Sequence, residues 1–357
     1  MPRLYYLGGF VPAAVILDLL GVSASLVFVS SALGVIPAAA LMSDATEQLA
    51  EHSGPSVAGL LNVTFGNAPE LIIAVFALAD GLQEVVKASL VGSVIGNALL
   101  VLGAAMLAGG RRHPVQRFGV GAARVQAITL VAGVGALVVP SVVRLAQGSP
   151  LPAVDDPRQS FGSGLETLSI VVAFVLILAY VASLLASLRG GRGGPSAEQD
   201  REQPRWSRRK ALAVLGAASL LVAVASDTLV GSVEHASSQI GLSQFFIGLI
   251  VVAIVGNAAE HWVAVVAAVR DKMDLTISIA VGSAAQVGMF LAPVVVLLSF
   301  LIGPAPMAMV FNGYELVALA LAALLAAALT ARGRSTARSG VALLTLYSAL
   351  AILSALA

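Results

Sequence analysis

Two short stretches, Gly66-Asn67-Ala68-Pro69-Glu70 and Gly256-Asn257-Ala258-Ala259-Glu260, decide the fold of this 357-residue chain. They lie 190 residues apart, and Val91-Gly92-Ser93 recurs at the same offset as Val281-Gly282-Ser283. In both copies 23 residues therefore separate the glutamate from the serine. Two matches that keep one spacing indicate an internal repeat, each copy of which carries an acid within an apolar run.

The composition around these stretches is that of a polytopic membrane protein. Hydrophobic residues make up 58% of the chain and charged residues only 11%, whereas about a quarter of a soluble domain is charged. A net charge of +1 and an aromatic content of 5% argue against a nucleic-acid partner. The absence of cysteine excludes disulfides and thiolate metal sites. Because the apolar residues form long runs and do not alternate, we expect helices in a lipid bilayer and not a β-barrel.

The apolar runs predict eleven transmembrane helices, since each helix needs about 20 residues to cross the apolar core of a bilayer. The predicted spans cover residues 4–20, 24–49, 56–79, 84–107, 118–143, 163–188, 209–233, 243–269, 275–301, 308–331 and 338–356. The predicted fold is therefore an all-α polytopic membrane protein.

The repeat divides these spans into an N-terminal transmembrane helix (1–21), a first five-helix repeat (22–188), a linker (189–208) and a second five-helix repeat (209–357). An alpha-repeat lies within each half, at about 56–107 and 243–301. Because five is an odd number, the two repeats are expected to have opposite orientations in the bilayer. This inverted-repeat architecture is typical of transporters that bind their substrate near the bilayer midplane.

The basic residues indicate the orientation of the chain. With eleven spans, sixteen of the 20 Lys and Arg residues fall on the side of the N-terminus and the linker. The positive-inside rule therefore predicts a cytoplasmic N-terminus and a cytoplasmic linker. A cleaved signal peptide ending near Val22-Ser23-Ala24 is the alternative interpretation of the first span.

Glu70 and Glu260 are the strongest candidates for a functional site. An ionised carboxylate at the bilayer centre costs at least about 2.5–3.5 kcal/mol, so it is seldom there without a role. Pro69 removes a backbone donor, and a broken helix of this kind presents carbonyl oxygens beside a carboxylate. Calcium takes about six to eight oxygen ligands. We predict a calcium site from oxygen-bearing side chains of both repeats: Glu70, Glu260, Asn67 and Asn257, with Ser93 and Ser283 nearby.

Each of these residues also has a purely structural interpretation. The glutamates could be protonated packing groups, the asparagines could form hydrogen bonds between helices, and the serines could allow close packing. Gln286 and Asn97 break the repeat, since their counterparts are Gly96 and Val287, so each is a ligand or a supporting residue on one side only. His261 is a candidate proton carrier or a hydrogen-bonding residue.

At these residues the sequence resembles the calcium/cation antiporter superfamily and, within it, the cation/proton exchanger (CAX-type) branch. The resemblance rests on Gly59 to Glu70 and on Val255 to His261, extended by Lys272-Met273-Asp274-Leu275 and Gly282-Ser283-Ala284-Ala285-Gln286. Sodium/calcium exchangers of that superfamily carry additional hydroxyl and acidic groups around the repeat glutamates, where this chain has Asn and Ala. Pro69 and Gly96 depart from the residues that are commoner in the branch.

The resemblance implies a Ca²⁺/H⁺ antiporter that needs no cofactor. Glu70 and Glu260 would bind calcium and protons in turn, surrounded by Asn67, Asn257, Ser93, Ser283 and Gln286 and assisted by His261. The implied location is a prokaryotic inner membrane, and a homo-oligomeric assembly is left open.

Three other functions are alternatives to calcium/proton exchange. A sodium- or potassium-coupled calcium exchanger is the nearest alternative. A cation channel would normally draw identical rings of residues from several subunits. An embedded metalloenzyme would need a motif such as His-Glu-x-x-His, and none of the four histidines forms one, so no enzyme is expected.

Overall fold

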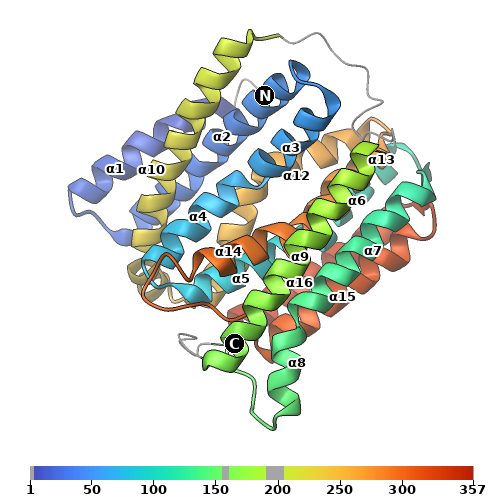
Figure 1. The fold of residues 1–357 in the computed structure, drawn as a ribbon. Coiled ribbons are helices and arrows are strands. Elements are labelled where there is room, and N and C mark those ends of the chain that lie inside the picture. The colour runs from blue at the N-terminus through green and yellow to red at the C-terminus, as the bar shows by residue number, and fades with distance from the viewer. Residues whose placement is uncertain (1–3, 155–160, 190–204, 357) are drawn as a thin grey trace.

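The computed structural model describes residues 4–154, 161–189 and 205–356, which are almost entirely helical (Figure 1). The first half contains η1 (Leu4–Gly9), α1 (Phe10–Leu19), α2 (Ala24–Glu51), α3 (Pro55–Gly66), α4 (Ala68–Ala79), α5 (Gln83–Ile95), η2 (Gly96–Val101), α6 (Leu102–Arg112), α7 (Val120–Leu137), α8 (Val139–Ala146) and α9 (Ser163–Arg189). The second half contains α10 (Arg208–Ile240), α11 (Gln244–Phe246), η3 (Ile247–Val252), α12 (Ala253–Val269), α13 (Met273–Gln286), η4 (Val287–Leu291), α14 (Ala292–Leu298), α15 (Gly313–Thr330) and α16 (Ala337–Leu356). Two short strands, β1 (Gln116–Arg117) and β2 (Arg334–Ser335), pair antiparallel.

The number of membrane spans is close to the prediction without reaching it. Within the described residues, nine helices are long and apolar enough to cross a bilayer, or ten if the bent pair α3–α4 counts as one span. The segment Leu7–Leu19 forms a shorter apolar helix. The structure therefore establishes an all-helical protein with nine candidate spans, and eleven spans stay a prediction.

One predicted span begins too early. The run 308–331 was expected to be a single helix, but residues 306–312 are not helical and α15 starts at Gly313. Asn312 caps α15: its Oδ1 accepts from the backbone N–H of Glu315 at 2.7 Å, and Glu315 Oε2 accepts from the N–H of Asn312 at 2.8 Å. Such a capping box satisfies two backbone donors at once and fixes the start of a helix.

The two repeats share an interrupted helix in the same place. In each one, the helix that follows the glutamate-bearing segment passes through a π-helical stretch, η2 between α5 and α6 and η4 between α13 and α14. Such stretches often occur at functional sites, because the extra residue in the turn redirects side chains and loosens the regular hydrogen-bond ladder.

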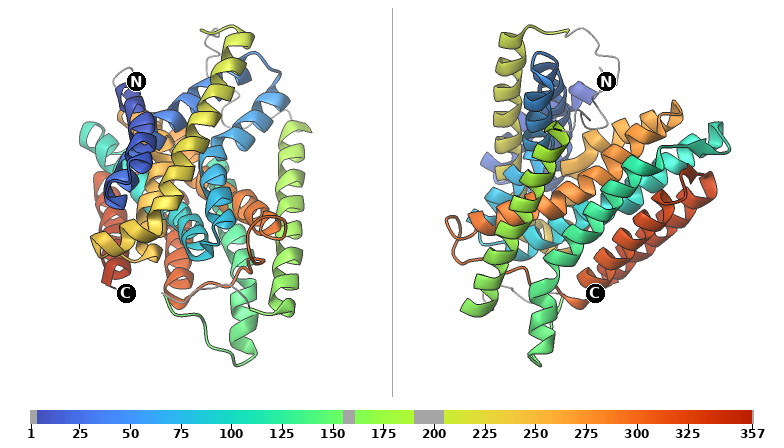
Figure 2. Two further views of the ribbon diagram at one scale, coloured as in Figure 1. Left: turned by 90° about the vertical axis from the view of Figure 1, so that its left-hand side faces the viewer. Right: turned by 45° about the vertical axis from the view of Figure 1, so that its right-hand side comes forward.

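Helices α1, α2 and α10 form a group at one side of the molecule, steeply inclined to the layer that contains α6, α7, α12, α13, α15 and α16 (Figure 2). Polar contacts join α2 to α10 near the middle and at one end. Ser31 donates to Thr228 Oγ1 at 2.9 Å, and Gln239 Oε1 accepts from the hydroxyl groups of Ser23 and Ser25 at 2.9 and 2.8 Å. This pair reaches the rest of the protein mainly through α3, α12 and α4.

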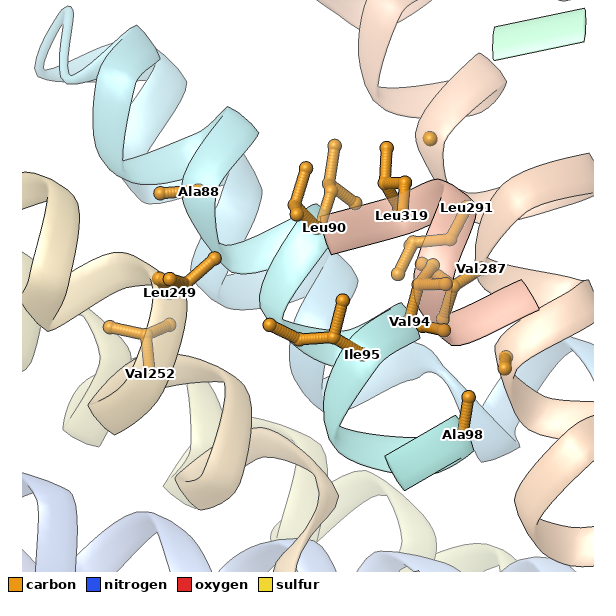
Figure 3. Close-up of a cluster of buried hydrophobic side chains, with 14 of the residues drawn as sticks. Ala88, Leu90, Val94, Ile95, Ala98, Leu249, Val252, Val287, Leu291 and Leu319 are labelled. Atoms are coloured by element: carbon orange, nitrogen blue, oxygen red, sulfur yellow. The ribbon is translucent and has the colours of Figure 1, made fainter. Parts of the chain in front are cut away.

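The two repeats interlock most closely where α5 crosses η3. A methyl group on Gly92 would overlap the carbonyl oxygen of Leu249, and one on Gly248 would lie 2.7 Å from the carbonyl oxygen of Val85. Buried apolar side chains pack on both sides of α5 (Figure 3). Leu249 and Val252 lie on one side, and Val287, Leu291 and Leu319 lie on the other. The helix segment itself contributes Ala88, Leu90, Val94, Ile95 and Ala98. Glycine is thus needed on both helices because the backbones are in direct contact.

In each repeat, a buried glutamine forms hydrogen bonds at the turn between the glutamate-bearing helix and the helix that follows it. Gln83, at the start of α5, donates to the carbonyl oxygen of Ala305 at 2.6 Å. Gln116, in β1, donates to the carbonyl oxygen of Ala268 at 2.7 Å and to Asp271 Oδ1 at 2.8 Å. The turns α4–α5 and α12–α13 are thereby tied to loops of the opposite half.

We predict that Gly92→Ala destabilises the protein strongly, because overpacking against a fixed backbone costs about 1–3 kcal/mol or more. The matched control is Gly96→Ala, since nothing that the structure describes lies within 4 Å of a methyl group there. Thermal unfolding of the purified protein in detergent measures the difference. Equal unfolding temperatures for the two variants would contradict the close crossing of α5 and η3.

Candidate cation site

The break between α3 and α4 places the first glutamate. The two helices meet at 43° around Asn67, and Pro69 lies in the first turn of α4, where its missing N–H leaves no bond unmade. Glu70 lies in the same turn. The first turn of a helix favours a negative charge because its N–H groups point toward it. Glu70 therefore has a backbone environment suited to a carboxylate.

The second glutamate lies on a helix that has no such break. Helix α12 continues from Ala253 through Glu260 to Val269. Ala259 stands where the first repeat has Pro69 and keeps the backbone N–H that a proline would lack. The hydroxyl group of Ser283 on α13 donates to Glu260 Oε2 at 2.8 Å and orients this carboxyl group.

The side chain of each glutamate lies next to the glycine in the motif of the other repeat. A methyl group on Gly256 would lie 2.9 Å from Glu70 Cγ, and one on Gly66 would lie 3.6 Å from Glu260 Oε1. Residues separated by 190 positions in the sequence thus meet in one small region.

The two side chains that break the sequence repeat play matching structural roles. Asn97 donates to Asn257 Oδ1 at 3.2 Å, and Gln286 Oε1 accepts from Asn67 Nδ2 at 3.0 Å. Each contact joins the asparagine of one repeat to an amide of the other. Gln286 lies one residue before the position equivalent to Asn97 and is longer by one methylene group, which offsets the difference.

The serines complete this network. Asn257 Nδ2 donates to Ser93 Oγ at 3.1 Å, and Asn97 Nδ2 lies 3.4 Å from Ser283 Oγ as a donor. All seven predicted site residues therefore lie in one neighbourhood. Asn67, Glu70, Ser93, Asn257 and Ser283 are buried, and Glu260 and Gln286 are partly buried.

Three buried oxygen atoms at this site have no hydrogen-bond partner among the residues that the structure describes: Asn67 Oδ1, Glu70 Oε2 and Asn97 Oδ1. A buried polar atom without a partner costs about 1–3 kcal/mol, so such a cluster requires an explanation. All three atoms are acceptors, and Glu70 and Ser93 also line a small cavity with Ser89. Hard cations prefer such oxygen atoms.

His261 stands apart from the network. It follows Glu260 on α12, and its Nε2 is buried without a hydrogen-bond partner in the described part of the chain. Nor do three or more His, Asp and Glu side chains converge anywhere in the described ranges. Two carboxylates and neutral oxygens are what the site offers.

Sequence reasoning named Asn97 as a candidate ligand or supporting residue but missed Gln126. Asn97 is completely buried and donates to Asn257 on α12 and to Ser283 on α13. Gln126 lies on α7, with its Nε2 3.6 Å from where a methyl group on Gly282 would be, next to Ser283. An uncharged polar side chain inside an apolar span is the signal that would have found Gln126.

This arrangement defines a class: a multi-pass helical membrane protein in which two halves of one chain contribute acids to a shared central site. The chain belongs to the sodium/calcium exchanger protein family, whose model matches residues 23–189 and 210–356.

Relatives and solved structures agree with this membership. The chain is 40% identical to a Ca(2+)/H(+) antiporter of Synechocystis sp., over 96% of this chain and 94% of the relative. It is 39% identical to the Ca(2+)/H(+) antiporter ChaA of Bacillus subtilis, over 99% of both chains. The structure of native YfkE matches with a TM-score of 0.84 and 37% identity, covering 99% of this chain and 100% of that one. The H+/Ca2+ exchanger CAX shares the fold, with a TM-score of 0.71 at 14% identity, over 99% and 92% of the two chains.

The glycine contacts predict different effects of two matched substitutions. Gly256→Ala would press on Glu70 Cγ and displace this side chain, whereas Gly66→Ala adds an ordinary contact with Glu260. We therefore expect Gly256→Ala to weaken calcium binding about ten-fold or more, since misplacing one group of a metal site typically costs that much. Gly66→Ala should bind nearly as the wild type does. Calorimetric titration measures both, and a larger loss for Gly66→Ala would contradict the contacts described.

Proposed function

We propose that this protein exchanges Ca²⁺ for H⁺ across a membrane by alternating access, with Glu70 and Glu260 binding either the calcium ion or protons. The observation that carries the proposal is the meeting of the two glutamates, each against the glycine of the opposite repeat. The names of the relatives support the same exchange: Ca(2+)/H(+) antiporters in bacteria and a vacuolar cation/proton exchanger of rice at 36% identity.

Charge balance gives the coupling. Two carboxylates facing one space can hold one Ca²⁺ or two protons, but not both together, because a bound cation displaces protons from its ligands. The empty dianion is too costly to carry through an apolar region. If the protein changes between inward-facing and outward-facing states only when the pair is neutralised, calcium moves one way and protons move the other.

The neutral groups divide the remaining work. Asn67, Asn257, Ser93, Ser283 and Gln286 surround the carboxyl groups and supply or orient oxygen atoms for calcium. Ser283 holds Glu260 by a hydrogen bond, so this carboxyl group approaches the ion in a fixed orientation. His261 follows Glu260 in the sequence, and we propose that its imidazole assists proton transfer.

The proposed topology keeps eleven spans and two inverted five-helix repeats. It counts α1 as the first span, α3–α4 as one broken span, and residues 189–208 as a cytoplasmic linker between the repeats at 22–188 and 209–357. Three of the basic loops meet at one end of the molecule, because β1 pairs with β2 and Gln116 bonds to the α12–α13 turn. This convergence supports a cytoplasmic face at that end and a cytoplasmic N-terminus.

We further propose that α2 and α10 slide as a pair during transport. They form a separately inclined group, and they contact α3 and the two helices that carry the glutamates, α4 and α12. In contrast, the turns α4–α5 and α12–α13 are fastened by Gln83 and Gln116. If α2 and α10 move while the glutamate-bearing helices stay in place, the site between them would open alternately to the two sides of the membrane.

We expect that Glu70→Gln and Glu260→Gln each abolish calcium/proton exchange while the protein still folds. An amide keeps the volume of the side chain, but it can neither release a proton nor neutralise the ion. The measurement is calcium uptake into inside-out vesicles with an imposed pH gradient. Asp18→Asn is the matched control, because Asp18 is exposed at the end of α1. Near-normal exchange in either glutamate variant would contradict the site assignment.

The second expectation concerns pH and sodium. Since calcium binds only when the carboxyl groups have lost their protons, its apparent affinity should fall as the pH falls through their titration. Titration calorimetry in buffers of different ionisation enthalpy should show proton release on binding at the acidic end of the range. The Glu70→Gln/Glu260→Gln double variant should show none. Calcium that is displaced by sodium and not by acid would assign the protein to sodium-coupled exchange.

A further inference from the structure

Two arginines lie opposite each other on the small β-ribbon formed by β1 and β2. In this antiparallel pair Arg117 is the direct partner of Arg334, and Gln116 is the partner of Ser335. Gln116 and Ser335 are buried, whereas both arginines are exposed. Like charges directly opposite on neighbouring strands destabilise the pairing, because their Cβ atoms are only about 4.5–5.5 Å apart. An anion beside the two arginines would remove this cost.

The acids on the adjacent α12–α13 turn hold the backbone of this region and do not neutralise the arginines. Asp271 Oδ1 accepts from the side chain of Gln116 at 2.8 Å, and Asp274 Oδ1 accepts from the backbone N–H of Gly119 at 2.7 Å. Within the part of the chain that the structure describes, no carboxylate forms an ion pair with either arginine of the ribbon. Their guanidinium groups are thus available to a ligand from outside the chain.

The ribbon lies just outside the apolar core of a bilayer. Each of its strands joins two candidate membrane spans, β1 between α6 and α7 and β2 between α15 and α16. Arg117 precedes the first residue of α7 by three positions, and Arg334 precedes that of α16 by three. Three residues of chain extend at most about 10 Å, and the polar layer on each side of the apolar core is about 5–8 Å thick. Both arginines are therefore at or near the level of the lipid phosphates.

A third arginine lies on an exposed face of the adjacent span. Val120, Arg124 and Ile128 follow at intervals of four residues on α7, so they share one face of the helix, and all three are exposed. A charged side chain on an apolar, lipid-facing surface is costly unless it extends to the headgroups. This face begins next to the ribbon, because a methyl group on Gly333, the neighbour of Arg334, would lie 2.5 Å from Val120 Cγ2.

From these placements we propose that Arg117, Arg334 and Arg124 bind the phosphate group of an anionic phospholipid, whose acyl chains lie along the exposed face of α7. Arginine suits this role because its planar guanidinium group forms paired hydrogen bonds with phosphate oxygens. The apolar side chains of Val120 and Ile128 would pack against the acyl chains. This lipid site goes beyond the proposed exchange and would exist without it.

The bound lipid would also strengthen the attachment of a glutamate-bearing helix. It offsets the repulsion between the paired arginines and so stabilises the ribbon. Gln116, next to Arg117 on β1, donates to the carbonyl oxygen of Ala268 at 2.7 Å, close to the end of α12. A stable ribbon therefore keeps this end of α12 in place.

The test is native mass spectrometry of the purified protein in detergent, titrated with phosphatidylglycerol. Loss of one basic group beside an anionic headgroup should weaken binding about five-fold, so Arg117→Gln/Arg334→Gln should lose about 25-fold. Arg208→Gln/Arg209→Gln is the matched control, since it removes two exposed arginines at the start of α10. It should keep the wild-type affinity. Equal losses in the two double variants would indicate general charge attraction and overturn the proposal.

Competing ligands distinguish a lipid from a small anion. Phosphatidylcholine should bind more weakly than phosphatidylglycerol, because its choline group already neutralises the phosphate, and equal binding of the two lipids would contradict the proposal. Inorganic phosphate at the same concentration should not displace phosphatidylglycerol; displacement would assign the arginines to a soluble anion. If Arg117→Gln/Arg334→Gln does not accumulate, Arg124→Gln decides the matter. It should weaken binding about five-fold, and an unchanged affinity would overturn the proposal.

Discussion

The carboxyl groups of Glu70, which is buried, and Glu260, which is partly buried, lie in one small region and constrain everything around them. Within apolar surroundings each carboxyl group must either take up a proton or, when ionised, lie beside a cation. The loss of hydration is otherwise too costly. Their approach is permitted by the glycine of the opposite motif, since a side chain at Gly256 would occupy the position of Glu70. The proposed exchange follows from the same constraint, as calcium and protons are the alternative means of neutralising the pair.

Duplication accounts for the architecture, and divergence between the copies accounts for the chemistry of the site. The matching π-helical stretches η2 and η4 and the crossed glycine contacts preserve the symmetry of the repeat, whereas a third π-helical stretch, η3, precedes α12. Pro69 breaks one glutamate-bearing helix, whereas Ala259 leaves the other continuous. Asn97 and Gln286 occupy positions one residue out of register, yet each binds the asparagine of the other half. The halves therefore keep a common framework while offering different groups to an ion.

Rigidity is distributed unevenly over the fold. The crossing of α5 and η3 brings backbones into contact, and a buried glutamine fastens the turn of each alpha-repeat to the opposite half. Helices α2 and α10 instead form an inclined group whose contact with α3 and α4 is a cluster of apolar side chains. Interfaces of this kind can slide at low cost, because apolar side chains of similar size exchange partners without leaving hydrogen bonds unmade.

The sequence by itself determined the class of protein, the approximate limits of its helices and the glutamates of its candidate site. It could do so because apolar runs of bilayer length have few other uses and because a buried acid repeated at one spacing is seldom accidental. The start of α15 was misjudged, since the cap at Asn312 depends on a local hydrogen bond that hydropathy does not register. Only the tertiary structure decided which amide faces which. The hydrogen bond from Asn97 to Asn257 joins segments 160 residues apart, and helix packing brings these segments together.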